Sequence, residues 1–386
     1  MKLRSIYLEN FRSYKKINIK IENNKFVVLT GKNGIGKTNL LEAISFLSPG
    51  RGFKNCKLDE VINTDINVNR CSIFFVIENK NEKNEIGISF VNESVDNSLQ
   101  GRKIIHLNGK KLKKQSDLPN LVSLIWLTPE MDFFFRTNSL FRRKFVDRCI
   151  FNLKPEYSNY LRIYEKNLKE RSKILKDLST KDFFYIEGKN IEKDLWLKKI
   201  EEKLVIEGLK IFQERINFSN DFNSLSSNFK NFPRIKIFLT GKIEKFLFSQ
   251  DIQLVKKIYL QKLYESRKID SIKGSISYGP NKSDLKVIFL KKKLLAEKCS
   301  TGEQKIILIS LIIQFCKLMN KKKKSPILLL DEIVAHLDNK IKASLFEELK
   351  TLENQAWMTG ADISLFSSII KDKEVINLEI EDLLKQ

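Results

Sequence analysis

Short runs of alternating apolar and polar residues dominate the first part of the chain, and this pattern predicts β-strands. In 3–8 and 17–21 side chains alternate in this way, as in a strand with one buried face. Residues 26–30 are nearly all apolar, which predicts a central strand covered on both faces. Further strands are expected at 71–78 and 85–91, and Asn108-Gly109 within 104–112 predicts a hairpin.

From about Leu140 to Arg267 the apolar spacing changes to that of helices. One stripe consists of Tyr157, Tyr160, Leu161, Tyr164 and Leu168, and another of Leu197, Ile200, Leu204 and Ile211. The stripes are too short and too interrupted for a long coiled coil, so they predict a compact helical lobe. Gly188 and the polar stretch 217–231 are interpreted as its loops.

The last third mixes both patterns. Strand-like runs at 234–240 and 273–278 precede a long apolar helix at 302–319, a buried strand at 327–330, a helix at 342–352 and a strand at 355–359. The order of elements predicts a mixed α/β fold with a discontinuous head. We expect the head to consist of 1–124 plus 266–386, with a mainly helical lobe, 125–265, inserted in its middle.

Composition limits the class of protein. The chain has 386 residues, 42% of them hydrophobic, which is enough for a sizeable core. No apolar run approaches the roughly 18 residues of a membrane span, and no signal peptide is evident, so a soluble cytoplasmic protein is expected. The five scattered cysteines form no CxxC pair and predict buried, reduced thiols. With two histidines, a His-based triad or His-rich metal site is disfavoured.

The net charge of +23 has two interpretations. A polyanionic partner, DNA or RNA, is the functional one. Compositional bias is the other, because the chain is rich in Lys, Asn, Ile and Phe throughout and such bias creates no binding face. Charge alone leaves both open.

A glycine-rich stretch after the strand 26–30 carries the first specific chemistry. Its spacing matches the phosphate-loop pattern G-x-x-x-x-G-K-[ST], and an amphipathic helix follows. The glycines let successive N–H groups point at a phosphate, and the helix N-terminus adds partial positive charge. We expect Lys37 to reach the β- and γ-phosphates and Thr38 to ligate Mg²⁺. The candidate nucleotide-binding residues are Gly31, Lys32, Asn33, Gly34, Ile35, Gly36, Lys37, Thr38 and Asn39.

Two adjacent carboxylates end the buried strand 327–330. Asp331 would lie at the carboxyl edge of the sheet and anchor Mg²⁺ together with Thr38. The side chain of the next residue, Glu332, would point in a different direction from that of Asp331 and would deprotonate the attacking water. The catalytic candidates are therefore Lys37, Asp331 and Glu332.

A third motif, Ser300-Thr301-Gly302-Glu303-Gln304-Lys305, opens the long apolar helix. Locally it reads as a capping box, in which Ser300 and Glu303 cap the helix reciprocally. Its order with the other motifs, far from the phosphate loop and just before the Asp331-Glu332 strand, resembles the signature of ABC-type ATPases in their SMC-like branch.

Other stretches resemble the RecF family of recombination mediator proteins along essentially the whole chain. They are Asn10-Phe11-Arg12, Gly50-Arg51-Gly52-Phe53, Leu127 to Asp132, Arg142 to Arg148, and Arg267-x-x-Asp270-x-x-x-Gly274-x-x-x-x-Gly279-Pro280. The chain departs from the family after Gly279-Pro280, where Asn281-Lys282-Ser283-Asp284-Leu285 stands in place of His-Arg-Asp-Asp-Leu. The middle of the helical lobe matches only in character, so its contacts cannot be carried over from the family.

The resemblance implies an ABC-type (SMC-like) ATPase head that binds ATP and Mg²⁺ and forms an ATP-dependent homodimer. Ser300, Gly302 and Gln304 of one chain would complete the nucleotide site of the other, and Asp338 would touch across the interface. Arg12 would approach the phosphates. Thr359 is a weaker candidate for a switch position, and His336 is interpreted as an interface or packing residue.

The resemblance also implies DNA binding, with RecR, RecO and RecA as partners in repair. Two basic clusters are candidate DNA contacts, Arg142, Arg143, Lys144 and Arg148, and Lys110, Lys111, Lys113 and Lys114, although either could be a solvated face. Two other functions stay open at this point. One is a different SMC-like enzyme, such as a nuclease-associated ATPase, and the other is a nucleotide-gated DNA scaffold without significant hydrolysis.

Overall fold

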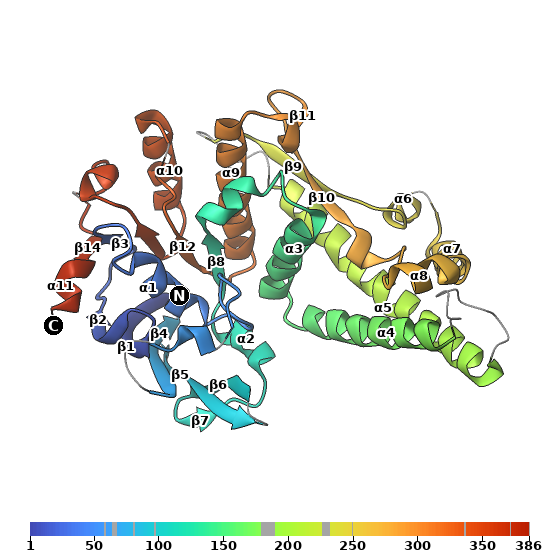
Figure 1. Cartoon of the computed structure of the whole chain (residues 1–386). Coiled ribbons are helices and arrows are strands. Elements are labelled where there is room, and N and C mark those ends of the chain that lie inside the picture. Colours follow the sequence, from blue (N-terminus) through green and yellow to red (C-terminus); the bar gives the residue numbers. More distant parts are fainter. Residues whose placement is uncertain are drawn as a thin grey trace. The chain divides into compact units, whose positions relative to one another are not determined.

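The computed structural model describes residues 1–57, 59–63, 68–79, 82–95, 98–178, 190–225, 232–248, 250–335, 337–370 and 372–385. The chain divides into two compact units, drawn together in Figure 1. The first consists chiefly of Met1–Asp132 and Leu308–Gln386, and the second chiefly of Phe133–Asn228 and Pro233–Ile307. The predicted division assigned 266–307 to the head instead, and its boundaries stay a prediction.

The first unit contains an antiparallel sheet that the alternating runs predicted. Its order is β2-β1-β4-β5-β6-β7, and side chains alternate between buried and more exposed positions along β4 and, from Lys16 onwards, along β2. The hairpin at Asn108-Gly109 is confirmed, with positive φ angles of 47° and 79° between β6 and β7. The strands are β1 (Lys2–Phe11), β2 (Tyr14–Lys20), β4 (Arg70–Asn79), β5 (Glu82–Val95), β6 (Ser98–Leu107) and β7 (Lys110–Lys111).

A parallel sheet of order β14-β3-β13-β12-β8 forms the centre of the same unit. Every residue of β3, β8, β12 and β13 is buried. Apolar runs predicted strands at β3, β12 and β13, whereas β8 was not among the predicted strands. The strands are β3 (Phe26–Thr30), β8 (Leu124–Leu127), β12 (Ile327–Leu330), β13 (Ala356–Thr359) and β14 (Val375–Glu379). The helices are α1 (Lys37–Ser45), α2 (Leu118–Leu121), α10 (Asn339–Thr351) and α11 (Ile380–Leu384).

Helices make up most of the second unit. They are α3 (Ser139–Leu153), α4 (Tyr157–Asp177), α5 (Ile191–Asn223), α6 (Glu244–Leu247), α7 (Ile252–Glu265) and α8 (Arg267–Lys273). A small antiparallel sheet, β11-β10-β9, accompanies them, with β9 at Ile235–Thr240, β10 at Asp284–Phe289 and β11 at Leu294–Leu295. The helix α9 (Thr301–Lys321) begins in this unit and continues into the first.

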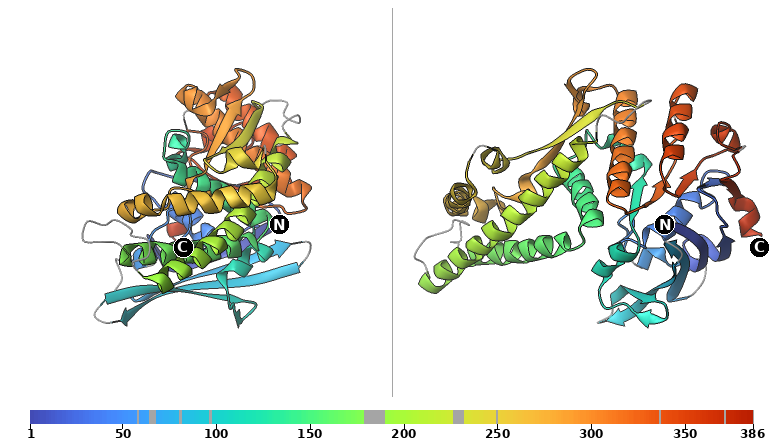
Figure 2. Two further views of the ribbon diagram at one scale, coloured as in Figure 1. Left: turned by 90° about the vertical axis from the view of Figure 1, so that its right-hand side faces the viewer. Right: turned by 180° about the vertical axis from the view of Figure 1, so that it is seen from behind.

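The two longest helices of the second unit pack antiparallel. Arg171 of α4 pairs with Glu201 of α5, while Tyr157, near the start of α4, meets Arg215, near the end of α5. Both helices can be followed in green and yellow-green in Figure 2. The second predicted stripe, Leu197, Ile200, Leu204 and Ile211, is buried throughout. Of the first, Tyr157 and Tyr164 are buried, while Tyr160, Leu161 and Leu168 are only partly buried.

Two local predictions were wrong. The stretch 217–223 is not a loop, because α5 continues to Asn223 and buries Phe218 and Phe222, four residues apart, on one face. The run 273–278 is not a strand, because α8 ends at Lys273 and Gly274 adopts a left-handed conformation with φ 62°. Its apolar residue Ile276 is buried as part of an irregular loop. Gly188 and 226–231 lie outside the described residues.

All five cysteines are buried free thiols, as predicted. Within the described part of the chain, no helix combines the length and apolar character that crossing a bilayer requires.

Candidate functional site

Four chain segments meet at the carboxyl edge of the parallel sheet. The glycine loop follows β3, Asp331 follows β12, Thr359 ends β13, and Glu381 lies just after β14. Because these strands are parallel, their carboxyl ends lie at one edge, where nucleotide sites form in open α/β sheets. Figure 1 shows α1 rising from this edge after β3.

The loop has the backbone geometry that its glycines predicted. Gly31, Gly34 and Gly36 have φ angles of 141°, 82° and 120°, and α1 begins directly at Lys37. An added Cβ at Gly36 would lie 2.9 Å from both the Ser13 and Tyr14 hydroxyl oxygens. Only glycine therefore fits this position.

Lys37 is buried and folds back over its own loop. Its ammonium group donates to the Gly31 carbonyl and, over 2.9 Å, to the Lys32 carbonyl. The side chain thus places a buried cation inside the curve of the loop. Lys32, Asn33 and Gly34 are exposed, while Ile35, Thr38 and Asn39 are partly buried.

Asp331 is the acceptor in a small hydroxyl network. Thr38 Oγ1 donates to Asp331 Oδ1 over 3.0 Å, and Thr359 Oγ1 donates to the same oxygen over 2.7 Å. Burial of the carboxylate raises the pKa of Asp331, although both hydroxyl bonds act to lower it. A buried carboxylate beside a hydroxyl supplies the hard oxygen ligands that Mg²⁺ prefers, so the donor set fits that ion.

Glu332 takes a strained backbone conformation next to this network. Its φ angle is 50°, its side chain is exposed, and its N–H donates to Thr359 Oγ1 over 2.8 Å. A non-glycine residue with positive φ is uncommon and costs free energy. Thr359 therefore connects both carboxylate residues. The sequence alone predicted it only as a weaker candidate for a switch position.

Three supporting residues had no signal in the sequence. The Tyr14 hydroxyl donates to the Gly36 carbonyl over 2.9 Å, and burial raises the pKa of Tyr14. Glu42, fully buried in α1, accepts two hydrogen bonds from Arg12, at 3.1 and 2.8 Å. Glu381 Oε1 accepts from the Lys32 N–H over 3.0 Å. All three partners are distant in sequence, so no local motif could show them.

The contact with Glu42 gives Arg12 a structural partner. Burial alone would lower the pKa of Arg12, but the Glu42 carboxylate outweighs it and raises that pKa. The Asn10-Phe11-Arg12 motif ends β1 and enters the turn to β2, with φ angles of 56° at Asn10 and 50° at Arg12 and with Phe11 fully buried. The expected approach of Arg12 to phosphate stays a prediction.

The third motif forms the capping box that its sequence predicted. The Ser300 N–H donates to Glu303 Oε2 over 3.1 Å, and the Glu303 N–H donates to Ser300 Oγ over 3.4 Å. Gln304 is buried, and its amide donates to the Cys299 carbonyl over 3.0 Å. Gly302 is exposed with open space where a Cβ would stand. The helix start therefore presents Ser300 and Gly302 to solvent.

Asp338 caps another helix. Its carboxylate accepts from the Ile341 N–H over 2.8 Å at the start of α10. The expected contact of Asp338 with a second chain stays a prediction, and His336 lies outside the described residues.

The structure speaks against part of the first basic cluster as a DNA contact. Arg142 is buried and holds Asp284 with two hydrogen bonds of 2.7 and 3.0 Å. Arg143 donates to the Ser283 carbonyl over 2.6 Å, and burial lowers the pKa of Arg148 to about 10. Arg142 and Arg143 are held by these bonds within the second unit, so we withdraw both, while the partly buried Arg148 stays a candidate. Lys144 is exposed, as are Lys110 and Lys111 on β7.

Comparison with known proteins agrees with this arrangement. Residues 2–361 match the family model of the RecF/RecN/SMC N terminal domain. The chain is 34% identical over 378 residues to the DNA replication and repair protein RecF of Rickettsia canadensis, covering 97% of this chain and 99% of the relative. It is 33% identical over the same length to the protein of that name from Rickettsia prowazekii.

Solved structures show the same fold. One is described as the recombination mediator protein RecF-ATP in the RecFOR pathway, with a TM-score of 0.77, 24% identity and coverage of 98% of this chain and 95% of that one. The Smc head domain of Pyrococcus furiosus, bound to the C-terminal domain of ScpA, has a TM-score of 0.51 at 18% identity, covering 99% and 94%. With its full-length similarity to the Rickettsia proteins, the chain belongs to the RecF family, within the wider group of RecF, RecN and SMC N-terminal domains.

Proposed function

We propose that this chain is an ATP-dependent DNA-binding protein of recombinational repair and replication. It works as an ATP-gated dimer clamp on DNA and hydrolyses ATP slowly. The observation that carries the proposal is the meeting of Lys37, Thr38, Asp331 and Thr359 at one sheet edge. Its family membership supports the same assignment, because relatives with 34% identity are named DNA replication and repair proteins.

The proposed nucleotide chemistry follows from the residues at that edge. Lys37 would exchange its loop carbonyls for oxygens of the β- and γ-phosphates, and the loop N–H groups would bind the remaining charge. Thr38 and Asp331 would hold Mg²⁺, which neutralises phosphate charge when bound. Glu332, held at its backbone by Thr359, would orient and deprotonate the attacking water.

Slow turnover fits the surroundings of Arg12. An arginine supplied to the transferring phosphoryl group typically accelerates hydrolysis by about 10³–10⁵-fold. Arg12 is the arginine that the resemblance places near the phosphates, and its guanidinium is engaged by Glu42. We therefore expect hydrolysis to be slow and the ATP-bound state to be correspondingly long-lived.

The nucleotide would gate assembly through Ser300 and Gly302 of a second chain. A charge-assisted hydrogen bond contributes roughly 1.5–3 kcal/mol, so two bonds at each of two sites give about 6–12 kcal/mol. Association costs on the order of 4–15 kcal/mol. The γ-phosphate contacts are thus comparable with the whole cost of dimerisation, and we expect ATP to drive it and ADP not to.

The DNA clamp would track the phosphate backbone with little base readout. Its candidate contacts from the sequence are now the exposed Lys110, Lys111, Lys113, Lys114 and Lys144, together with the partly buried Arg148. One protein of similar fold is described as a recombination mediator of the RecFOR pathway. By that relationship we propose RecR and RecO as partners and the loading of RecA at DNA gaps as the outcome.

A gel-shift experiment tests the proposal. Wild type and Lys37→Met are compared on duplex, gapped and single-stranded DNA with ATP, ADP or no nucleotide. We expect ATP-dependent binding that the variant lacks; equal binding under all conditions would contradict an ATP gate. Measuring phosphate release from wild type separates this function from a scaffold that does not hydrolyse ATP.

A further inference from the structure

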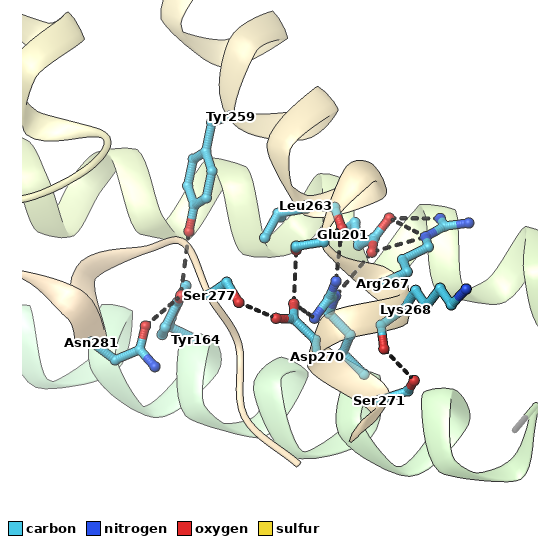
Figure 3. Close-up of polar contacts among 12 residues, drawn as sticks. Tyr164, Glu201, Tyr259, Leu263, Arg267, Lys268, Asp270, Ser271, Ser277 and Asn281 are labelled. Atoms are coloured by element: carbon cyan, nitrogen blue, oxygen red, sulfur yellow. Dashed lines mark hydrogen bonds and ion pairs between the residues drawn. The ribbon is translucent and has the colours of Figure 1, made fainter. Parts of the chain in front are cut away.

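One motif has no place in the nucleotide site, namely Arg267 to Pro280 in the second unit. Two of its charged residues, Arg267 and Asp270, join a buried ion network with the long helices (Figure 3). Arg171 donates to Glu201 over 2.9 Å and to Asp270 over 2.7 Å, and Arg267 donates to Glu201 over 2.6 Å. All four side chains are nearly inaccessible to solvent. Such a network fixes α8 against α4 and α5.

The network also holds the irregular loop after α8. Asp270 accepts from the Ser277 hydroxyl over 2.5 Å, which anchors the middle of the loop (Figure 3). At its end, Gly279 has φ 133°, and an added Cβ there would overlap the Tyr164 and Tyr259 hydroxyls. The loop 274–279 is therefore a fixed structure, although it contains no regular element.

This rigid loop forms one wall of a basic pocket of about 500 Å³. Lysines from three segments line it: Lys242 and Lys245 after β9, Lys273 at the end of α8, and Lys282 after the loop. Ser275 and Ser277 add hydroxyl groups, and no acidic residue is among the lining residues. We call these residues the lysine pocket.

Three of the four ammonium groups are poorly neutralised by the described part of the protein. Within the part of the chain that the structure describes, Lys242, Lys273 and Lys282 have no ion-pair partner, and Lys242 lies 4.7 Å from the centre of the Tyr278 ring. Lys273 and Lys282 are exposed. Several like charges around one concavity repel each other, and an anion bound among them removes that repulsion.

We propose that the lysine pocket binds backbone phosphates of DNA. Lysines act on phosphate as mobile point charges, and serine hydroxyls are common phosphate donors. The volume admits a phosphate with its sugar, and none of these groups selects a base. This inference rests on the proposed DNA-binding function and assigns it a site that neither predicted basic cluster includes.

The position of Lys282 supports the assignment. It follows the buried pair Gly279-Pro280 at the end of the fixed loop, and its own side chain is exposed and lines the pocket. The neighbouring Asp284 is engaged by Arg142 and Lys286, at 2.7 and 3.3 Å, and so does not neutralise Lys282. The pocket thus retains its charge.

The test compares two double variants with the same loss of charge. Lys273→Gln/Lys282→Gln removes two pocket cations, and Lys199→Gln/Lys203→Gln removes two exposed lysines of α5 outside the pocket. DNA affinity is measured by fluorescence anisotropy on a duplex with ATP, from about 50 to 300 mM salt, after thermal melts show that both variants fold.

We expect the pocket variant to bind at least about tenfold more weakly and to lower the log–log salt slope by about two, one per lost contact. The α5 variant should keep the wild-type slope. A pocket variant with the wild-type slope would overturn the pocket while leaving the clamp intact. Wild type that fails to bind DNA at any salt would instead overturn the proposed function, and the inference with it.

Discussion

Thr359 donates its hydroxyl hydrogen to Asp331 Oδ1 over 2.7 Å and accepts from the Glu332 N–H over 2.8 Å. One side chain therefore holds both the proposed magnesium ligand and the backbone of the proposed base. It can do so because β12 and β13 are parallel neighbours, in the register Leu330↔Met358, so that residues following the two strands meet.

Replacing this hydroxyl should separate hydrolysis from binding. Thr359→Val leaves Asp331 without one donor and the Glu332 N–H without its acceptor, at a cost of about 1–3 kcal/mol. We expect the ATPase rate to fall roughly 10- to 100-fold while ATP affinity changes little, because the loop around Lys37 is untouched. Thr359→Ser keeps the hydroxyl and should behave like wild type. Equal rates for Val and Ser variants would show that Thr359 has no part in catalysis.

Asp331 should show a conflict between stability and function. Burial raises the pKa of its carboxyl above the ordinary value, so the native state binds a proton more readily than the unfolded chain. The penalty of the buried charge is therefore fully present above that raised pKa and disappears as pH falls through it. Asp331→Asn should melt at a higher temperature than wild type at neutral pH.

The same substitution should abolish the Mg²⁺ dependence of ATP binding, because an amide is a poor substitute for the carboxylate ligand. For wild type, affinity for Mg·ATP should fall as pH is lowered towards the raised pKa, since protons compete with the metal. Calorimetric titrations at several pH values measure this. For the melting prediction, an Asp331→Asn variant that melts at a lower temperature than wild type would contradict it. The bonds from Thr38 and Thr359 would then stabilise the ionised carboxylate by more than burial destabilises it.

Glu381 brings a negative charge to the phosphate loop. Its carboxylate accepts a hydrogen bond from the Lys32 N–H and lies against Gly31. This bond to the backbone is the main reason why the pKa of Glu381 is lowered. The group is thus ionised where phosphates would bind. Glu381→Gln should tighten ATP binding about two- to fivefold, the effect of one solvent-screened charge.

Asp382→Asn is the matched control, since Asp382 is exposed on the same helix and pairs with Lys385 over 3.3 Å. Titration with a fluorescent, non-hydrolysable ATP analogue compares the three proteins. Weaker binding by Glu381→Gln would mean that the carboxylate supports the loop instead of opposing phosphate.

The buried network of the second unit should dominate its stability. Arg171→Met leaves the Glu201 and Asp270 carboxylates partly unpaired in the interior, which typically costs about 3–5 kcal/mol. Lys166→Met removes an exposed pair with Glu170, 3.9 Å long, and should cost less than about 0.5 kcal/mol. Urea unfolding of both variants provides the comparison. Similar midpoints would show that the network serves specificity and adds little stability.

The sequence predicted the loop and strands of the nucleotide site because their signals are local. Lys37 and Thr38 stand in one short motif, and Asp331 ends one apolar run. Tyr14, Glu42 and Glu381 could not be predicted, because each meets its partner only after the strands have paired.

Local signals also misled where a loop or a helix end depends on tertiary contacts. Ile276 suggested a strand, but it is buried in a loop that Ser277 and Gly279 hold in place. The basic run from Arg142 to Arg148 suggested a DNA face. Its first two arginines bind Asp284 and Ser283, over a hundred residues away, and spacing alone cannot reveal such partners.

Mixing two inactive variants tests the central claim that the dimer shares its ATP sites. Lys37→Met lacks a phosphate-binding lysine, and Ser300→Arg blocks the corner that would enter the partner's site. Each alone should hydrolyse almost no ATP. A mixed dimer contains one intact site, so an equimolar mixture should recover about a quarter of wild-type activity. A mixture as inactive as its components, from chains that still dimerise with ATP, would contradict shared sites and with them the ATP-gated clamp.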